Sequence, residues 1–322
     1  MNKYLLLSIN LLISLLLVIV IINYVGFSEL SAEFSHLDLF FLFLSILSIF
    51  IMDIIMSYRI KIILDELKSP IKFLNILRSH FVGMLLSDFT PSRSGYFATA
   101  AVLRYNYDVP SDHALLSVFG PQIFDFAFKV IIGSIGALYI ISVFLGADNG
   151  LILLLGAIFI SLIVCTMLLT LFSKNFLNLF KFVEKIPILS KLYLTVVKMQ
   201  ESSHIIVKKT PDIAFLIGLN WIFRSLSWFF AAKSVGITLN LDFPEFLFYF
   251  FLQPFLSIVE FLPSPTIAGL GLTEGGATTI FSFFGVLPSK AASFALLVRF
   301  KSTILHLPAI SESLKALPKI KI

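Results

Sequence analysis

Two stretches rich in glycine, proline and charge interrupt a chain that is otherwise built from long apolar runs. They are residues 88–95 (DFTPSRSG) and residues 262–276 (LPSPTIAGLGLTEGG). A bilayer interior has no water to satisfy backbone N–H and C=O groups, so irregular chain at that depth persists only where protein buries it or where it lines a polar cavity. Two such breaks, one in each half, predict a site for a polar ligand within the membrane.

The rest of the chain predicts an all-α polytopic membrane protein. Hydrophobic residues make up 58% of the 322 residues, charged residues only 13%, and the mean hydropathy is +0.98, which excludes an ordinary soluble domain. A helix needs about 20 apolar residues to cross the hydrocarbon core. Seven segments come close to this length, at residues 4–25, 39–58, 112–144, 151–172, 211–232, 243–261 and 288–310. We therefore expect one integral membrane domain over residues 1–322, multi-pass in the cell membrane.

The distribution of lysine and arginine predicts the orientation of this domain. The segment after the first span carries Glu29, Glu33 and Asp38 and no cation, so we expect it to face outward. The segment beginning at Arg59 and the link over residues 173–210 are rich in cations and should face the cytoplasm. The link alternates apolar and basic residues, which is typical of an amphipathic helix in the inner interface.

Short helices beside the breaks predict two re-entrant hairpins. Residues 71–86 and 95–105 are each too short and too interrupted to cross the membrane alone, so they are expected to enter and leave from the cytoplasmic side. The same reasoning applies to residues 273–284, which follow the second break. The pattern leaves open whether the chain has seven or eight crossings.

The two breaks also belong to a pseudo-repeat. Tyr96 lies fourteen residues before Pro110 of a Pro-Ser pair, and Glu274 lies fourteen residues before Pro288 of another. An apolar run containing alanine follows each pair. Chance similarity between two apolar segments is the alternative explanation of this pattern.

Ionisable residues within the apolar segments are the strongest candidates for the polar site, because a charge at the bilayer centre costs roughly 2.5–3.5 kcal/mol on insertion scales. Arg93, Asp125, Arg224, Glu274 and Arg299 lie near the middle of a span or at a break. The alternative for these five residues is a structural network of buried ion pairs. Asp53 and Lys129 are as compatible with a role as anchors at span ends as with a place in the polar site. His306 is more typical of a packed, hydrogen-bonded histidine than of a ligand-binding residue.

Sequence motifs for catalysis and cofactor binding are absent. No His or Cys cluster has the spacing of a zinc site, and no glycine-rich loop ends in Gly-Lys-Ser/Thr. The run GLGLTEGG has no strand before it and is better explained as a helix break, in which glycines allow close approach to a ligand and Thr273 suits an N-cap. We expect no cofactor, no metal and no nucleic-acid partner.

These residues resemble the flippase-like transmembrane family typified by the membrane domain of lysylphosphatidylglycerol synthase. Residues 90–95 (TPSRSG) are similar to a family pattern Pro-x-Arg-x-Gly-Glu, with Tyr96 in the position of the glutamate. Residues 262–265 with 269–274 (GLGLTE) match the family's Pro, Gly-x-Gly, Glu pattern, and Arg299 falls where the arginine of the last span is expected. Residues 122–125 (QIFD) are similar to Arg-x-x-Asp, with Gln122 replacing the arginine.

The resemblance implies movement of a charged or glycosylated lipid between leaflets. The partner implied is a membrane lipid with an anionic, aminoacylated or glycosylated headgroup, and a lipid-modifying enzyme is a further possible partner. Transport is expected rather than catalysis, with a membrane enzyme acting on a phospholipid or polyprenyl-phosphate as the alternative. The residues predicted to bind the headgroup are Arg93, Ser94, Gly95, Asp125, Arg224, Gly269, Gly271, Glu274 and Arg299.

Overall fold

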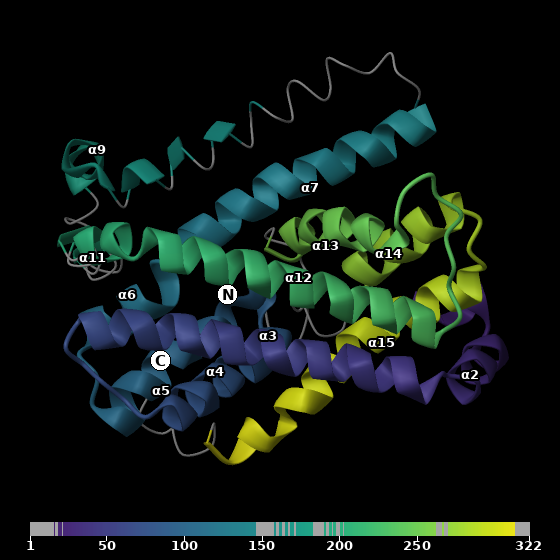
Figure 1. The fold of residues 1–322 in the computed structure, drawn as a ribbon, viewed down its shortest axis with the longest axis horizontal. Helices are drawn as coiled ribbons and strands as arrows, with labels where there is room; N and C mark the ends of the chain where they lie inside the picture. The colour runs from purple at the N-terminus through teal and green to yellow at the C-terminus, as the bar shows by residue number, and fades with distance from the viewer. Residues whose placement is uncertain are drawn as a thin grey trace.

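The computed structural model describes residues 22–145, 203–261 and 270–312, together with residue 266 and single residues or short stretches within 16–20 and 158–201. This described part is helical and contains no strand (Figure 1). Four of its helical segments are long and apolar enough to cross a membrane, at Leu39–Glu66, Ser111–Tyr139, Thr210–Ser234 and Pro288–Glu312. They correspond to four of the seven predicted spans. The chain is thus an all-α protein with several potential spans, whereas seven or eight crossings stay a prediction.

Two long helices, α3 (Leu39–Glu66) and α12 (Thr210–Ser234), lie side by side and run in opposite directions. The backbone N–H of Asp38 donates to the carbonyl of Ser234, at the start of α3 and the end of α12. At the other end, Glu66 pairs with Lys208. Between these ends small buried serines such as Ser45 and Ser227 allow close approach, as is common where membrane helices pack.

The same order of elements follows each of these two helices. In the first half the elements are α4 (Phe73–Asp88), the 3-10 turn η1 (Pro91–Tyr96), α5 (Phe97–Tyr107), α6 (Ser111–Phe119) and α7 (Gln122–Leu145). In the second half they are α13 (Glu245–Phe261), α14 (Leu272–Phe283) and α15 (Pro288–His306). A Pro-Ser pair opens the long segment after each short helix, and α4 packs on α15 while α13 packs on α7. Each half therefore places a helix against the other half.

Each break joins two helices that pack against each other in opposite directions. In the first half Gly83 of α4 lies against Thr99 of α5, and Gly95 lies against Leu86. In the second half the rings of Phe248 on α13 and Phe281 on α14 are in contact, with centroids 5.8 Å apart. In each half, therefore, the two helices on either side of a break pack against each other. Their entry into the membrane from one side stays a prediction.

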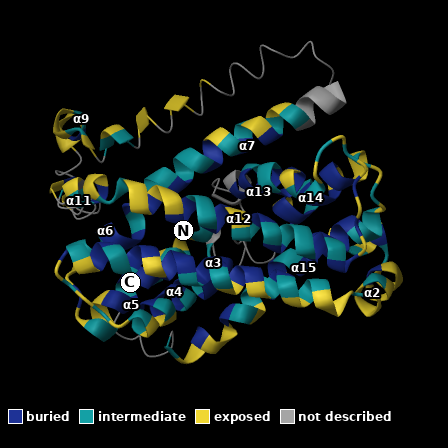
Figure 2. Ribbon diagram, in the orientation of Figure 1, coloured by how far each residue is buried: buried dark blue, intermediate teal, exposed yellow. Residues whose placement is uncertain are grey.

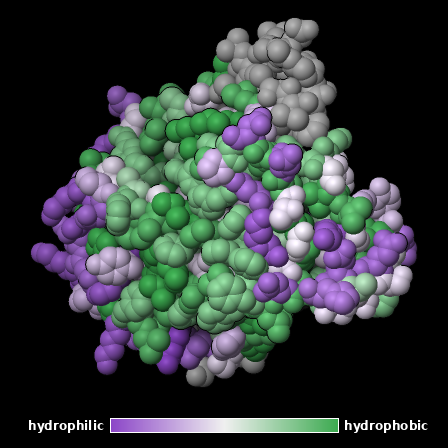
Figure 3. Space-filling view, turned by 45° about the vertical axis from the view of Figure 1, so that its right-hand side comes forward, coloured by the Kyte–Doolittle hydropathy of each residue, from purple (hydrophilic) through white to green (hydrophobic). Residues whose placement is uncertain are grey.

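Apolar side chains form both the core and much of the outer surface. A cluster of aromatic residues, including Tyr249, Phe281 and Phe294, fills the space between α12, α13, α14 and α15. Figure 2 shows where buried residues lie along the helices. Outside, large side chains such as Phe43 and Phe215 are more than half exposed, at 60% and 69%. Figure 3 shows a broad hydrophobic face between more hydrophilic margins. A surface of this kind suits contact with lipid.

The two cation-rich segments lie at the same end of the α3–α12 pair. Glu66 at the end of α3 pairs with Lys208 and with Lys209, which is 3.6 Å away. Asp38, in the acidic segment, lies at the opposite end. Within the link over residues 173–210 the structure describes two short helices, α9 (Lys174–Leu179) and α11 (Ser203–Lys208).

One cation of the predicted loop is not in a loop. Arg59 was expected just beyond the second span, but α3 continues to Glu66 and Arg59 is buried, with 1% exposed. The helix extends because residues 59–66 (RIKIILDE) still have good helix formers and apolar residues on one face, although charge ends the purely apolar run.

Candidate functional site

Asp88 and Arg93 of the first break and Thr273 and Glu274 of the second meet α12 and α15 around a cavity of about 80 Å³ that is partly open and has several charged side chains in its lining. Volumes of this size hold several water molecules. Six charged side chains line it, which are Asp88, Arg93, Arg224, Glu274, Arg299 and Lys301. Four of these are cations and two are carboxylates, so the lining carries a formal charge of +2. The cavity therefore favours an anion. We call this cavity the central pocket.

At the second break, Glu274 is held at the start of α14. Gly271 has a φ of +85°, a conformation that glycine adopts without strain, and its N–H donates to Glu274 Oε2 over 2.7 Å. The other carboxylate oxygen, Oε1, accepts from Arg299 Nε at 2.8 Å. The Thr273 hydroxyl donates to Glu274 Oε2 and accepts from Arg299 Nη2, over 3.0 and 3.1 Å. These contacts make a compact and buried ion pair.

This geometry corrects the expected roles of Thr273 and of the helix N-terminus. Gly271, not Thr273, is the N-cap residue, and Thr273 lies in the first turn. Because the Glu274 carboxylate already accepts the Gly271 N–H, the side chain occupies the place that an external anion would take at this helix end.

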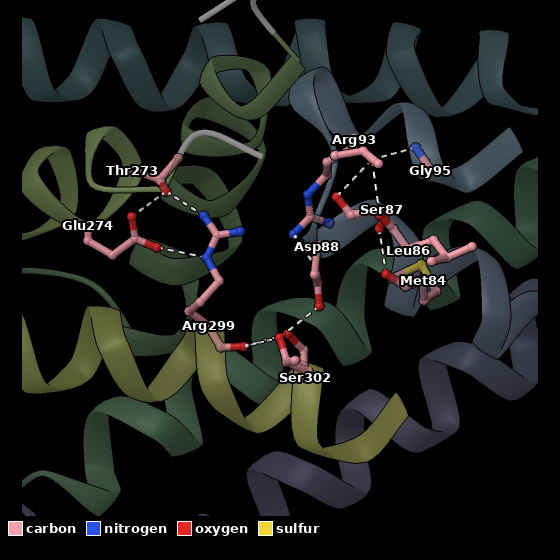
Figure 4. Close-up of polar contacts among 12 residues, drawn as sticks. Met84, Leu86, Ser87, Asp88, Arg93, Gly95, Thr273, Glu274, Arg299 and Ser302 are labelled. Carbon is pink, nitrogen blue, oxygen red and sulfur yellow. Dashed lines mark hydrogen bonds and ion pairs between the residues drawn. The ribbon is translucent and has the colours of Figure 1, made fainter. Parts of the chain in front are cut away.

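At the first break the ion pair is looser. Arg93 Nη2 lies 3.4 Å from Asp88 Oδ1, and the Arg93 side chain keeps 15% of its area exposed. Figure 4 shows the Arg93 and Asp88 side chains facing each other. The other oxygen of Asp88 accepts from the Thr303 hydroxyl of α15 at 2.9 Å. Arg93 also has a φ of +53°, which is rare for a residue with a side chain and costs on the order of 1–3 kcal/mol. The surrounding chain therefore fixes this arginine at the pocket.

Close packing at the tip of the first hairpin requires a glycine. A Cβ on Gly95 would lie 2.2 Å from the carbonyl oxygen of Leu86, and backbone at that position has little room to move. The Gly95 N–H donates to the Thr90 hydroxyl at 2.6 Å. Gly95 therefore acts through the backbone that positions Arg93.

The predicted site residues separate into those at the pocket and those elsewhere. Four line it, which are Arg93, Arg224, Glu274 and Arg299. Ser94 is exposed, and Gly269 lies outside the described residues. Asp125 lies outside the pocket lining and pairs with Lys129 of the same helix at 2.9 Å, while Trp221 Nε1 donates to it at 2.9 Å. The structure therefore brings four of the predicted residues to the lining of one pocket and places Asp125 beside Lys129 and Trp221, outside that lining.

The pocket also contains residues that the sequence prediction left out. They are the charged residues Asp88 and Lys301 and the uncharged residues Ser227, Trp228 and Gln253. Ser227 and Trp228 lie three and four residues after Arg224, so helical spacing alone places them on its face. Gln253 had no comparable signal.

The two residues that depart from the family pattern contact each other. The Tyr96 and Gln122 side chains lie within interaction distance of each other. The Tyr96 hydroxyl also lies 3.5 Å from His80 Nδ1. Thus the two positions at which the chain departs from the family pattern lie together in the structure, and both carry neutral polar side chains.

Among the residues that the structure describes, no group of three or more His, Cys, Asp or Glu side chains could hold a metal ion. The polar groups of the central pocket are instead those that recognise anions, chiefly guanidinium, ammonium and hydroxyl donors.

Comparison with known proteins gives one match. Residues 7–309, nearly the whole chain, match the family model described as the lysylphosphatidylglycerol synthase TM region. No curated protein matches the chain. The match includes both breaks and all of the central pocket's lining.

Proposed function

The chain belongs to the family of the lysylphosphatidylglycerol synthase transmembrane region, and from this premise we propose that it moves a lipid with an anionic headgroup between membrane leaflets. The family and the apolar helices indicate a multi-pass membrane protein linked to lipid handling. The step from lipid handling to lipid translocation rests on the central pocket.

The observation that carries the proposal is the convergence of both breaks on one pocket with excess positive charge. A buried excess charge in a membrane protein is costly unless a partner or a ligand compensates it. A phosphate group would compensate it, since guanidinium groups bind phosphate oxygens through charge-assisted hydrogen bonds. Large apolar side chains cover much of the outer surface, so the acyl chains would stay in lipid while the headgroup occupies the pocket.

The two ion pairs at the pocket provide a means to exchange partners. In the absence of a headgroup, Glu274 neutralises Arg299, and Asp88 neutralises Arg93. A phosphate would compete with these carboxylates for the same guanidinium groups. Since α15 carries Arg299 and also contacts Asp88 through Thr303, a shift of this helix would alter both pairs. Rocking of the two halves would then give alternating access.

The test is a leaflet-resolved assay in vesicles containing a fluorescent phosphatidylglycerol. We expect Arg93→Ala to lower the rate of movement at least tenfold, because about 1.4 kcal/mol of lost phosphate binding corresponds to a factor of 10. Glu274→Gln should also slow it, since the variant loses the carboxylate that returns Arg299 to its resting position. The matched control is Arg104→Ala, because Arg104 is an exposed arginine of α5 outside the pocket.

Wild-type rates in both pocket variants would contradict the site assignment. Vesicles containing an aminoacylated phosphatidylglycerol or a glycolipid would then determine which headgroup is preferred. Mass spectrometry of the lipids after the assay distinguishes transport from the alternative, because a covalently altered lipid appears only if the protein is an enzyme.

A further inference from the structure

A buried carboxylate lies between two buried histidines beside the central pocket. Asp53 of α3 accepts from His306 Nε2 of α15 at 2.9 Å and lies 3.2 Å from His80 Nε2 of α4. All three side chains are fully buried, with 0% exposed. Because each comes from a different helix, the cluster connects the first half to the second. Groups that titrate near neutral pH and lie within a membrane domain are expensive and usually functional.

The hydrogen bonds fix where an added proton would bind. An ionised carboxylate only accepts hydrogen bonds, so each histidine presents its Nε2–H to Asp53. The remaining nitrogen, Nδ1, is then the basic atom of each ring. His80 Nδ1 faces the Tyr96 hydroxyl at 3.5 Å. His306 Nδ1 is buried and has no hydrogen-bond partner among the residues that the structure describes.

His306 also lines the central pocket, which connects its protonation to the pocket's contents. We infer that Asp53, His80 and His306 form a proton-binding site that is coupled to anion binding in the central pocket. A proton added to His306 Nδ1 creates an N–H donor, and a phosphate oxygen in the adjoining pocket is the acceptor that satisfies it. The inference rests on the proposed function, because the anion that binds in the central pocket is the lipid headgroup of that proposal.

The proton balance is simple and involves no other reactant. A headgroup that enters the pocket brings a negative charge, and one proton from water binds to the lone pair of His306 Nδ1. Asp53 stays ionised and stabilises the imidazolium through the existing Nε2–H contact. When the headgroup leaves, the same proton returns to water. Coupling of this kind is reciprocal, so a lower pH strengthens anion binding to the same extent that the anion strengthens proton binding.

Other charged groups around the cluster determine whether an anion in the pocket favours or opposes protonation of the histidines. They are Arg59 on α3, Asp88 on α4, Tyr96 in η1, Arg224 on α12, Glu274 on α14 and Lys301 on α15. The neighbouring cations repel a positive charge on either histidine. The cluster therefore takes up a proton chiefly when an anion in the pocket offsets that repulsion. Lys301 donates to Ser45 and to the carbonyl and hydroxyl of Ser227, and thus has neutral partners.

The experiment measures binding of short-chain phosphatidylglycerol to the detergent-purified protein by calorimetry. Its phosphodiester keeps one charge between about pH 5.5 and about pH 8, so a change in affinity over this range reports on the protein. We expect about tenfold tighter binding at the lower pH, within the usual range of coupling between sites. Titrations in two buffers of different ionisation enthalpy should show the uptake of close to one proton per lipid.

The matched variants are His306→Gln, which can still donate to Asp53 but does not titrate, and His113→Gln, which changes a histidine of α6 that contacts Ser69 outside the cluster. His306→Gln should lose the pH dependence and the proton uptake, and His113→Gln should keep both. The proton count needs only the wild-type protein, so a count near zero would contradict the proton site even if His306→Gln does not fold.

Binding with equal affinity at both pH values and no proton uptake would overturn the proton site and leave the proposed transport intact. Unchanged pH dependence in folded His306→Gln would also overturn it. Absence of any binding to the wild-type protein would overturn the headgroup pocket together with this inference.

Discussion

The two breaks present arginines to the same pocket with different degrees of constraint. At the second break, Arg299 is buried and bonded to both Glu274 and Thr273, and the Glu274 carboxylate also caps α14. At the first break, Arg93 is partly exposed and lies 3.4 Å from Asp88. The comparison indicates that the second half holds a preorganised ion pair, whereas the first half holds a cation that exchanges partners more easily.

The difference also extends to the positions that correspond in the pseudo-repeat. Glu274 has its counterpart in Tyr96, which is neutral and interacts with the neutral Gln122. Tyr96 and Gln122 lie outside the lining of the central pocket, and the excess of cations in that lining comes from Arg224 and Lys301, beyond the two ion pairs at the breaks. The two halves therefore differ in charge at these corresponding positions, next to the pocket rather than in its lining.

The largest effect should come from Arg299→Ala, which leaves Glu274 buried without its cation. Breaking a buried ion pair in this way costs roughly 3–5 kcal/mol. We expect a large loss of thermal stability in detergent together with loss of lipid movement. Arg93→Ala, at the looser pair, should affect transport with much less loss of stability. Thermal unfolding of the two variants measures this contrast.

The control for that contrast is the double variant Arg299→Ala with Glu274→Ala. Removing both charges should recover much of the stability without restoring transport. Equal losses of stability in Arg93→Ala and Arg299→Ala would contradict the difference between the two breaks.

The next largest effect is expected at the tip of the first hairpin. In Gly95→Ala the new Cβ meets the Leu86 carbonyl carbon and oxygen, at 2.3 and 2.2 Å. Overpacking against backbone costs about 1–3 kcal/mol, and it should also displace Arg93. Gly275→Ala in α14 is the matched control, because nothing lies within 4 Å of its added Cβ. Thermal shift measurements should show a lower melting temperature only for Gly95→Ala.

Much of this arrangement could be predicted from the sequence, because charge and glycine within apolar runs have few explanations. The membrane class, both breaks and the pocket residues Arg93, Glu274 and Arg299 followed from that pattern. The same pattern also predicted Asp125 in this site, but Asp125 lies outside the lining of the pocket. A pattern of charges along the chain does not indicate which of them lie together in space. Here, however, Lys129 lies four residues after Asp125, and this spacing alone favours a pair within one helix.

Other features depended on tertiary contacts that no local pattern contains. Gln253 and Ser227 are uncharged residues of ordinary helices, and they reach the pocket only because α12 and α13 pack there. The cluster of Asp53, His80 and His306 joins residues far apart in the chain. The capping role of Glu274 also depended on the conformation of Gly271, which allows the carboxylate to turn back to the helix end.

The smallest effect is expected at Tyr96, which corresponds to Glu274 in the pseudo-repeat. Tyr96→Phe removes only a hydroxyl that contacts Gln122 and His80. Loss of such a neutral hydrogen bond costs about 0.5–1.5 kcal/mol, whereas Glu274→Gln leaves the buried Arg299 without a counter-charge and should cost more. A double-mutant cycle with Tyr96→Phe and Gln122→Leu, followed by thermal unfolding, measures the interaction between the two side chains. A coupling energy near zero would mean that the two neutral side chains do not stabilise each other at this position.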